Sequence, residues 1–237
     1  MKFSNGFEFH PSEGRMFEIL HEKRNKYIGI ETQTPWTLAE YTDIDTYHSY
    51  VISYSIALSE FTKERPNVLE IGCQAGGGLL FWKELLQPKI LCGIDIELAI
   101  PDHIATALYG GLKFQQFHML IDDAYDANII DRVMRIFPDG IDVLSEDGDH
   151  WVGNQIKTVE LYYPLMNSGG VIMIEDIKMF KDRDMNHFHH GGNYKHGMDG
   201  LYVLEEFLKC GNYNYQIFDL RSNKGSPDDI MVAIHVD

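Results

Sequence analysis

The chain has few cysteines, few basic residues and no long apolar run, and each shortage disfavours certain classes of protein. It has only three cysteines in 237 residues, and none stands in a Cys-x-x-Cys spacing, which favours reduced thiols in a cytoplasmic protein over a disulfide framework or a zinc site. No stretch reaches the roughly 18 uninterrupted apolar residues of a membrane span. The first residues, MKFSNGFEFHPSEGR, contain no continuous apolar stretch either. We therefore expect a soluble, unexported protein without a membrane partner.

Basic residues are outnumbered, 20 against 36 acidic residues, which gives a net charge of -16. Such a charge repels a phosphate backbone, so nucleic acid is disfavoured and a small-molecule substrate is favoured. The length of 237 residues, with 44% hydrophobic residues, fits one α/β domain with an N-terminal extension. Whether identical copies assemble into a homo-oligomer stays open.

Apolar stretches of strand and helix length alternate from residue 66 onward. Strands are expected at 67–73, 89–96, 113–120, 141–147 and 169–176, with helices at 77–86, 101–110, 126–137 and 154–166 between them. This alternation predicts a parallel sheet with right-handed crossovers. A helix at 198–211 and two alternating stretches, 213–222 and 228–237, then predict a closing antiparallel hairpin. The fold class expected is α/β.

Two segments flank or interrupt this alternation. Residues 1–63 form the expected N-terminal extension, in which 43–63 has helical apolar spacing and aromatic residues that we assign to the core. Tyr47 and His48, near the start of that helix, can reach a substrate. Residues 64–237 form the main domain, and its segment 177–198, polar and rich in His and Gly, is predicted to be a lid-like loop.

A glycine-rich turn follows the first strand of the alternation. The turn after Glu70 contains four glycines, Gly72, Gly76, Gly77 and Gly78. Glycine lets backbone approach a ligand closely at the start of a helix, which is typical of a nucleotide-type site. Gln74 stands where the dinucleotide motif needs its second glycine, which weighs against a dehydrogenase. Asp95, which ends the next strand, can accept both hydroxyls of a ribose, although a solvated strand-end acid is the alternative.

Acidic residues gather where two later strands end. Asp147 ends one strand, and Glu175 and Asp176 end the next, so neighbouring parallel strands would bring them within about 5 Å. Oxygen ligands of this kind suit Mg²⁺, Mn²⁺ or Ca²⁺ better than zinc, and we expect Mg²⁺. Solvated or helix-capping acids are the alternative. Because adjacent strand residues point to opposite faces, Glu175 and Asp176 can both bind the ion only if the strand bends there.

Five motifs in this order carry a family resemblance: EIGCQAGGGLLFW, GIDIE, the DAYD of residues 123–126, EDGDH and VIMIED. Together they resemble the class I S-adenosylmethionine-dependent methyltransferases. More narrowly, they are similar to the metal-dependent sugar O-methyltransferases of macrolide biosynthesis and their relatives labelled cephalosporin hydroxylases. The similarity covers residues 66–176 well, the hairpin in outline and residues 1–60 hardly at all. It implies a Rossmann-like, mostly parallel seven-stranded sheet with an antiparallel C-terminal hairpin.

The resemblance also implies where S-adenosylmethionine binds. Glu70 and the backbone of Gly72 to Gly77 would hold its methionine and ribose portion, and Asp95 would hold the ribose hydroxyls. Asp123 would meet the adenine amino group, with the backbone of Ala124 beside it. Relatives often have Gly-Asp-Gln where this chain has Asp122-Asp123-Ala124. Asp123 as the cap of the helix that starts near residue 126 is the alternative.

For the chemistry, the resemblance makes Asp147, Glu175 and Asp176 the metal ligands and His150 the general base. A hydroxyl is a poor nucleophile at neutral pH, and a histidine with an unperturbed pKa of about 6.5 can accept its proton. His150 as a ligand or as a residue of the helix N-terminus is the alternative. Glu146 and Asp149 are expected behind the ligands or in solvent.

The sequence therefore predicts an S-adenosylmethionine- and Mg²⁺-dependent O-methyltransferase that acts on a hydroxyl of a sugar or sugar-containing small molecule. Three alternatives remain. The acceptor can be a catechol or another phenolic diol, the chain can be an accessory protein that keeps the cofactor fold without methyl transfer, or it can be a dehydrogenase. In the predicted lid, Tyr194 and several histidines, His187, His189, His190 and His196, can contact a sugar or belong to a mobile polar loop.

Overall fold

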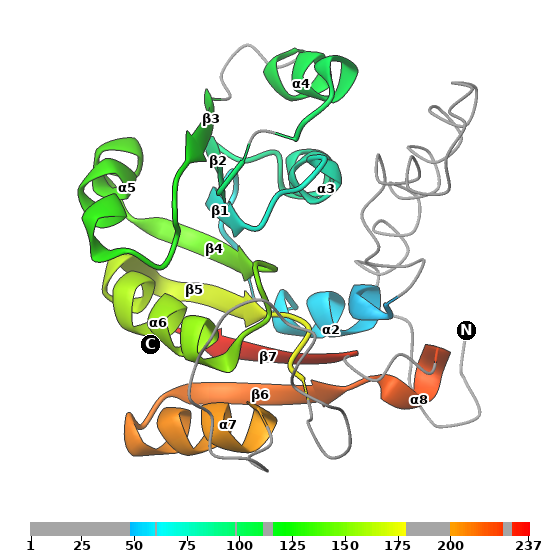
Figure 1. The fold of residues 1–237 in the computed structure, drawn as a ribbon, viewed down its shortest axis with the longest axis vertical. Helices are drawn as coiled ribbons and strands as arrows, with labels where there is room; N and C mark the ends of the chain where they lie inside the picture. Colours follow the sequence, from blue (N-terminus) through cyan, green and yellow to red (C-terminus); the bar gives the residue numbers. More distant parts are fainter. Residues whose placement is uncertain (1–47, 60, 98, 111–115, 179–199, 225–228) are drawn as a thin grey trace.

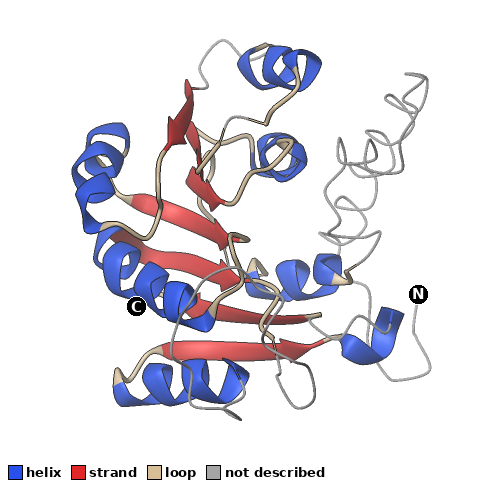
Figure 2. Ribbon diagram, in the orientation of Figure 1, coloured by secondary structure: helices blue, strands red, loops and turns tan. Residues whose placement is uncertain are grey.

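The chain folds around one mixed sheet with helices on both faces (Figures 1 and 2). The computed structural model describes residues 48–59, 61–97, 99–110, 116–178, 200–224 and 229–237. Within them the sheet has seven strands in the order β3-β2-β1-β4-β5-β7-β6. This confirms the predicted Rossmann-like α/β fold. No helix among the described residues is long and apolar enough to cross a membrane.

The sheet is parallel in its first five strands and antiparallel at the end. Parallel pairing joins β1 (Asn67–Ile71), β2 (Ile90–Asp95), β3 (Gln116–Ile121), β4 (Ile141–Glu146) and β5 (Met166–Ile174). β7 (Ile230–His235) lies antiparallel between β5 and β6 (Asn214–Asp219), which confirms the closing hairpin. A short helix that the sequence did not indicate, α8 (Arg221–Lys224), follows β6.

Side chains alternate along each strand and so build one core layer on each face of the sheet. One layer packs on α2 (Tyr50–Ala57), α3 (Gly77–Leu86) and α4 (Asp102–Tyr109). The other packs on α5 (Ile130–Ile136), α6 (Val152–Tyr162) and α7 (Gly200–Cys210), with the short 3₁₀ turns η2 (Ala127–Ile129) and η3 (Tyr163–Leu165) beside them. In β4, for example, Val143 belongs to the first layer and Leu144 to the second.

The helix α2 is shorter than the sequence indicated. Helical spacing extended over 43–63, whereas the helix runs from Tyr50 to Ala57, and Tyr47 lies outside the described residues. Its buried face contains Tyr50, Val51 and Tyr54, which pack in the layer that also holds residues of β5 and β7. The aromatic residues are thus part of the core, as expected. Most of the predicted lid also lies outside the described residues.

A buried aspartate ties three strands together at the amino edge of the sheet. Asp142 in β4 accepts hydrogen bonds from the Asn67 amide at the start of β1, at 2.7 Å, and from the Asn167 side chain in β5, at 2.7 Å. The Lys63 ammonium adds a third contact at 2.6 Å. Because the Asn67 amide is buried, this carboxylate satisfies a donor that water does not reach.

We expect Asp142→Ala to lower the free energy of unfolding by about 3 kcal/mol, because it leaves a buried amide and a lysine without their acceptor. Urea denaturation monitored by circular dichroism measures the loss. Asp139→Ala, which removes only the exposed ion pair with Lys89, is the control and should leave the free energy of unfolding close to that of the wild type. Equal effects of the two substitutions would contradict this account of the amino edge.

Candidate active site

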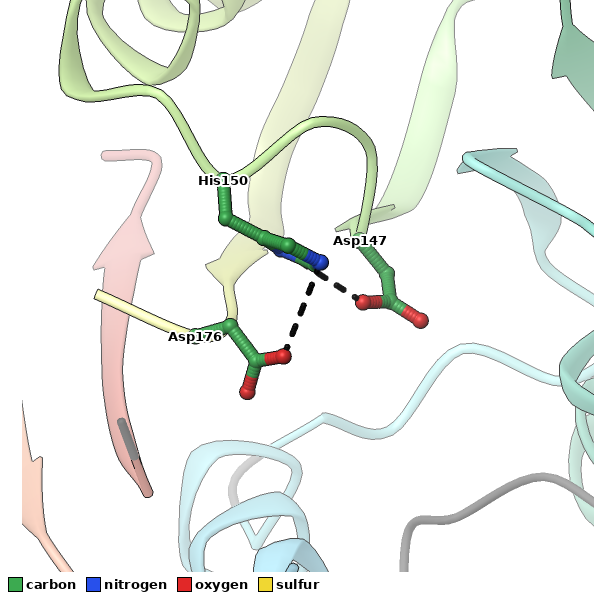
Figure 3. A group of neighbouring side chains, drawn as sticks. All are labelled: Asp147, His150 and Asp176. Carbon is green, nitrogen blue, oxygen red and sulfur yellow. Dashed lines mark ion pairs between the residues drawn. The ribbon is translucent and has the colours of Figure 1, made fainter. Parts of the chain in front are cut away.

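Three side chains meet at the carboxyl edge of the sheet: Asp147 after β4, Asp176 after β5, and His150 in the loop before α6 (Figure 3). Each offers one ligand atom, and these atoms lie within 4.8 Å of one another. The His150 Nδ1 atom is 3.9 Å from Asp147 Oδ1, and its Nε2 atom is 3.7 Å from Asp176 Oδ2. The Asp147 and His150 side chains are partly accessible, whereas Asp176 is buried.

The backbone bends at Asp176, where the sequence required a bend if Glu175 and Asp176 were both to bind the ion. The roles of Asp147, His150 and Asp176 remain predictions. The Glu175 amide still donates to the Glu146 carbonyl at 3.0 Å and so continues the pairing of β4 with β5. Asp176 then takes a φ of +50°, in the left-handed region that side-chain-bearing residues rarely adopt. The bend brings the Asp176 carboxylate beside His150 instead of leaving it on the opposite face of the sheet.

The structure does not bring Glu175 into the group of three. Its side chain is 3% exposed and points toward α2, as alternation along β5 requires. One carboxylate oxygen, Oε1, accepts hydrogen bonds from Ser145 Oγ at 2.7 Å and from the hydroxyl of Tyr54. Its role as a metal ligand therefore remains a prediction.

The donor set of the group fits a divalent cation. Two carboxylates supply hard oxygen atoms on neighbouring strand ends, and the imidazole supplies a third donor. Further carboxyl groups lie behind the group, because burial, then Glu175 and then Asp95 raise the pKa of the Glu70 carboxyl well above its usual range, which favours its neutral form. A bound cation would offset this concentration of carboxylates.

Two tyrosines of α2 hold the acid pair, and sequence reasoning placed them only in the core. The Tyr50 hydroxyl donates to Asp176 Oδ1 at 2.5 Å, and the Tyr54 hydroxyl donates to Glu175. Burial and then the adjacent carboxylates raise the pKa of both hydroxyls, which therefore remain protonated donors. A buried tyrosine needs a partner for its hydroxyl, so tyrosine rather than phenylalanine on the buried helix face was the available signal.

The Asp95 carboxylate binds the glycine-rich turn. Its Oδ2 atom accepts hydrogen bonds from the amides of Cys73 and Gln74, at 2.8 and 2.9 Å, which closes the turn against β2. The turn also contacts the acid group, since a Cβ on Gly72, whose φ is +81°, would lie 2.0 Å from the Asp147 carbonyl oxygen. The predicted cofactor turn and the acid cluster are therefore adjacent, while the ribose contact of Asp95 remains a prediction.

Glycines also place the predicted cofactor turn over Glu70. Gly76 caps α3 and Gly77 is its first residue. A Cβ at Gly78 would lie 1.9 Å from Glu70 Oε1, so the helix start packs directly on this buried acid. The geometry explains the glycines by close packing, and a contact of Glu70 with the cofactor stays a prediction.

The predicted adenine loop is held by one of its own side chains and by a tyrosine of α6. Asp123 Oδ1 accepts a hydrogen bond from the Tyr125 amide at 2.9 Å, and the buried Ala124 carbonyl accepts one from the Tyr162 hydroxyl at 2.7 Å. The alternative in which Asp123 caps the following helical turn is wrong. Asp126 caps it instead, through a bond from the Asn128 amide at 2.9 Å. The adenine contact remains a prediction.

Glu146 supports the loop that carries His150. It is fully buried, and its Oε1 atom accepts hydrogen bonds from the Tyr125 hydroxyl at 2.7 Å and the Gly148 amide at 3.3 Å. Burial raises its pKa from 4.5 to about 7, although both hydrogen bonds oppose the shift. Asp149 is exposed and accepts a bond from the Trp151 amide at 3.0 Å. Glu146 thus lies behind the acid group and Asp149 lies in solvent.

The raised pKa of Glu146 has a measurable consequence in cation-free protein. Between pH 4.5 and about 7 the folded protein keeps a proton that the unfolded chain releases, so Glu146 lowers the free energy of unfolding as pH rises. Relative to the wild type, Glu146→Gln should gain stability across this range, on the order of 3 kcal/mol. Urea denaturation at a series of pH values measures the difference. A difference that stays constant with pH would contradict the raised pKa.

The histidines and Tyr194 of the predicted lid, His187, His189, His190 and His196, lie outside the described residues.

Curated proteins match the chain over just over half of its length. An uncharacterized protein of Acanthamoeba polyphaga mimivirus is 29% identical over 140 residues, which are 57% of this chain and 62% of that protein. The 8-demethyl-8-alpha-L-rhamnosyl tetracenomycin-C 2'-O-methyltransferase of Streptomyces olivaceus is 25% identical over 139 residues, 55% of this chain and 34% of that protein. The chain thus spans less than two thirds of the length of these relatives.

Solved structures and a family model complete the comparison. The O-methyltransferase TomG from Streptomyces achromogenes, solved in complex with SAM, covers 97% of this chain and 92% of its own with a TM-score of 0.53. At 13% identity this likeness shows the fold alone. The family model described as Rhamnosyl O-methyltransferase/CmcI matches residues 43–226. Since this match includes well over half of the chain, the protein belongs to the Rhamnosyl O-methyltransferase/CmcI family.

Proposed function

We propose that the chain transfers a methyl group from S-adenosylmethionine to a hydroxyl of a sugar or sugar-containing small molecule, in a reaction that depends on Mg²⁺ or another hard divalent cation. The observation that carries the proposal is the meeting of Asp147, His150 and Asp176 beside the glycine-rich turn. Membership of a rhamnosyl O-methyltransferase family supports the reaction type and the class of acceptor.

The cofactor would lie over the carboxyl ends of β1 and β2. S-adenosylmethionine supplies a methyl group that its positive sulfur already activates. Glu70 and the turn from Gly72 to Gly77 would hold the methionine and ribose portion, and Asp95 would orient the ribose. Because Gly72 packs against the Asp147 backbone, a ligand held by this turn lies next to the acid group. Proximity of that kind can supply much of the rate acceleration in a two-substrate reaction.

Asp147 and Asp176 would hold the cation, with Glu175 as the third ligand. A divalent cation lowers the pKa of a hydroxyl bound to it and fixes that hydroxyl in place. Ser145 and Tyr54 engage one of the two Glu175 carboxylate oxygens, so contact with a cation requires the other oxygen.

His150 would accept the proton of the acceptor hydroxyl. Its two ring nitrogens face Asp147 and Asp176, so the positive imidazolium formed by proton transfer lies between two carboxylates. Its positive φ of +58° lets the loop turn the imidazole into the edge of the sheet. A general base has to come within hydrogen-bond reach of the proton that it accepts, and the place of the ring between the two carboxylates would set that reach.

Asp95→Asn tests the cofactor part of the proposal without knowledge of the acceptor. Loss of the charge should weaken both the closed turn and the ribose contact, and hydrogen bonds to charged groups predict an affinity for S-adenosylhomocysteine about 10- to 100-fold lower. Isothermal titration calorimetry measures it. Glu97→Gln, at an exposed neighbouring acid, is the control and should bind as the wild type does. Binding of NAD without S-adenosylhomocysteine would overturn the assignment.

His150→Ala should slow methyl transfer by about 10²- to 10⁴-fold, the usual contribution of a general base, while S-adenosylhomocysteine binding stays within a few-fold of wild type. Transfer of a labelled methyl group to a panel of rhamnosides, other glycosides and catechols measures the rate, with and without EDTA. Unchanged turnover would refute His150 as the base. Activity in EDTA would refute the cation, and turnover of catechols alone would refute the sugar acceptor.

A further inference from the structure

We infer that Tyr50 is a positioning residue that fixes Asp176 in the conformation in which its carboxylate faces His150. The inference rests on the proposed cation site and adds α2, which precedes the strand-and-helix alternation, to the parts of the chain that build it. It concerns a contact between residues 126 positions apart in the sequence.

One hydroxyl holds both the backbone and the side chain of Asp176. The Tyr50 hydroxyl accepts a hydrogen bond from the Asp176 amide at 3.0 Å. The same hydroxyl donates to Asp176 Oδ1 at 2.5 Å. The two bonds close a ring through Asp176, so the side chain cannot rotate without breaking one of them. With Oδ1 held by Tyr50, Oδ2 is the oxygen that lies 3.7 Å from His150 Nε2.

The two hydrogen bonds with Tyr50 act on a residue with an unfavourable backbone conformation. Asp176 has a φ of +50°, a conformation disfavoured for a residue with a Cβ. The preceding residue is different, because the Glu175 amide donates to the Glu146 carbonyl and is kept in place by the pairing of β4 and β5. Asp176 lies one residue beyond that pairing, and its amide bonds to Tyr50 instead.

Tyr50 itself is rigidly placed. Its side chain is buried, with the residue 1% exposed, and its ring stacks on His48 with ring centres 4.9 Å apart and planes within 5° of parallel. His48 Nδ1 lies 3.4 Å from Asp176 Oδ1 and 3.8 Å from the buried carboxylate of Asp229. The buried and stacked Tyr50 ring therefore holds its hydroxyl in one position beside Asp176.

Ser53 supplies a comparison within the same helix. It is 0% exposed, and its hydroxyl donates to the Tyr50 carbonyl at 3.0 Å and to the Met231 sulfur at 3.4 Å, neither of which belongs to a carboxylate. Ser53→Ala therefore removes a buried hydroxyl from α2 and spares the contacts of both Asp176 and Glu175.

Mn²⁺ binding to the cofactor-free full chain, measured by electron paramagnetic resonance, tests the inference. We expect Tyr50→Phe to weaken Mn²⁺ binding by about tenfold or more, the effect of one lost hydrogen bond to a charged group. Ser53→Ala, which removes a buried hydroxyl of the same helix that contacts neither Asp176 nor Glu175, should stay within about threefold of wild type. If both variants lose affinity equally, the effect belongs to the packing of α2, and the specific role of Tyr50 is overturned.

The outcomes separate this inference from the proposed function. Wild-type protein that binds no Mn²⁺ would overturn the cation site and the inference with it. Wild-type binding that Tyr50→Phe leaves unchanged would overturn only the inference. Hydrogen exchange of the Asp176 amide in cation-free wild type needs no variant, and decides the question if Tyr50→Phe does not fold. Protection of this amide supports the hold by Tyr50, and exchange at the rate of an open loop refutes it.

Discussion

The parallel pairing of β4 and β5 is the constraint on which the site depends. The pairing ends with the hydrogen bond from the Glu175 amide to the Glu146 carbonyl, so the loops after β4 and β5 begin at the same level of the sheet. Asp147 and Asp176 therefore face each other across one strand spacing. A one-residue shift of register would turn the acids to the other face of the sheet and separate the two carboxylates.

Buried polar contacts lie on both faces of the sheet near this edge, and they differ between the two faces. On the face of α2 and α3, buried acids and hydroxyls meet, with Ser145 and Tyr54 on Glu175 and Gly78 packed over Glu70. On the face of α5 and α6, Glu146 and Tyr125 hold the loop that carries His150. The group of Asp147, His150 and Asp176 thus lies between two buried polar layers, each of which restrains one of its loops.

Much of the fold followed from patterns that are local in the chain. Alternating strand and helix lengths predicted the parallel sheet, and the prediction of α3 agreed with the structure at both ends. The order of the acids after the strands also predicted that Asp147 and Asp176 would meet, because parallel strands share a carboxyl edge. Helix α2 was predicted too long, since Phe61 continues the apolar spacing and packs on the core although the helix ends at Ala57.

The sequence by itself determined which chemical groups follow which strand: glycines follow β1, an acid follows β2, and acids and a histidine follow β4 and β5. Tertiary structure alone decided how those groups are used. It turned Asp176 by a positive φ, directed Glu175 to Ser145 and Tyr54, and placed the Tyr50 hydroxyl on Asp176. These contacts join residues far apart in the chain, and a spacing pattern says nothing about which buried hydroxyl meets which carboxylate.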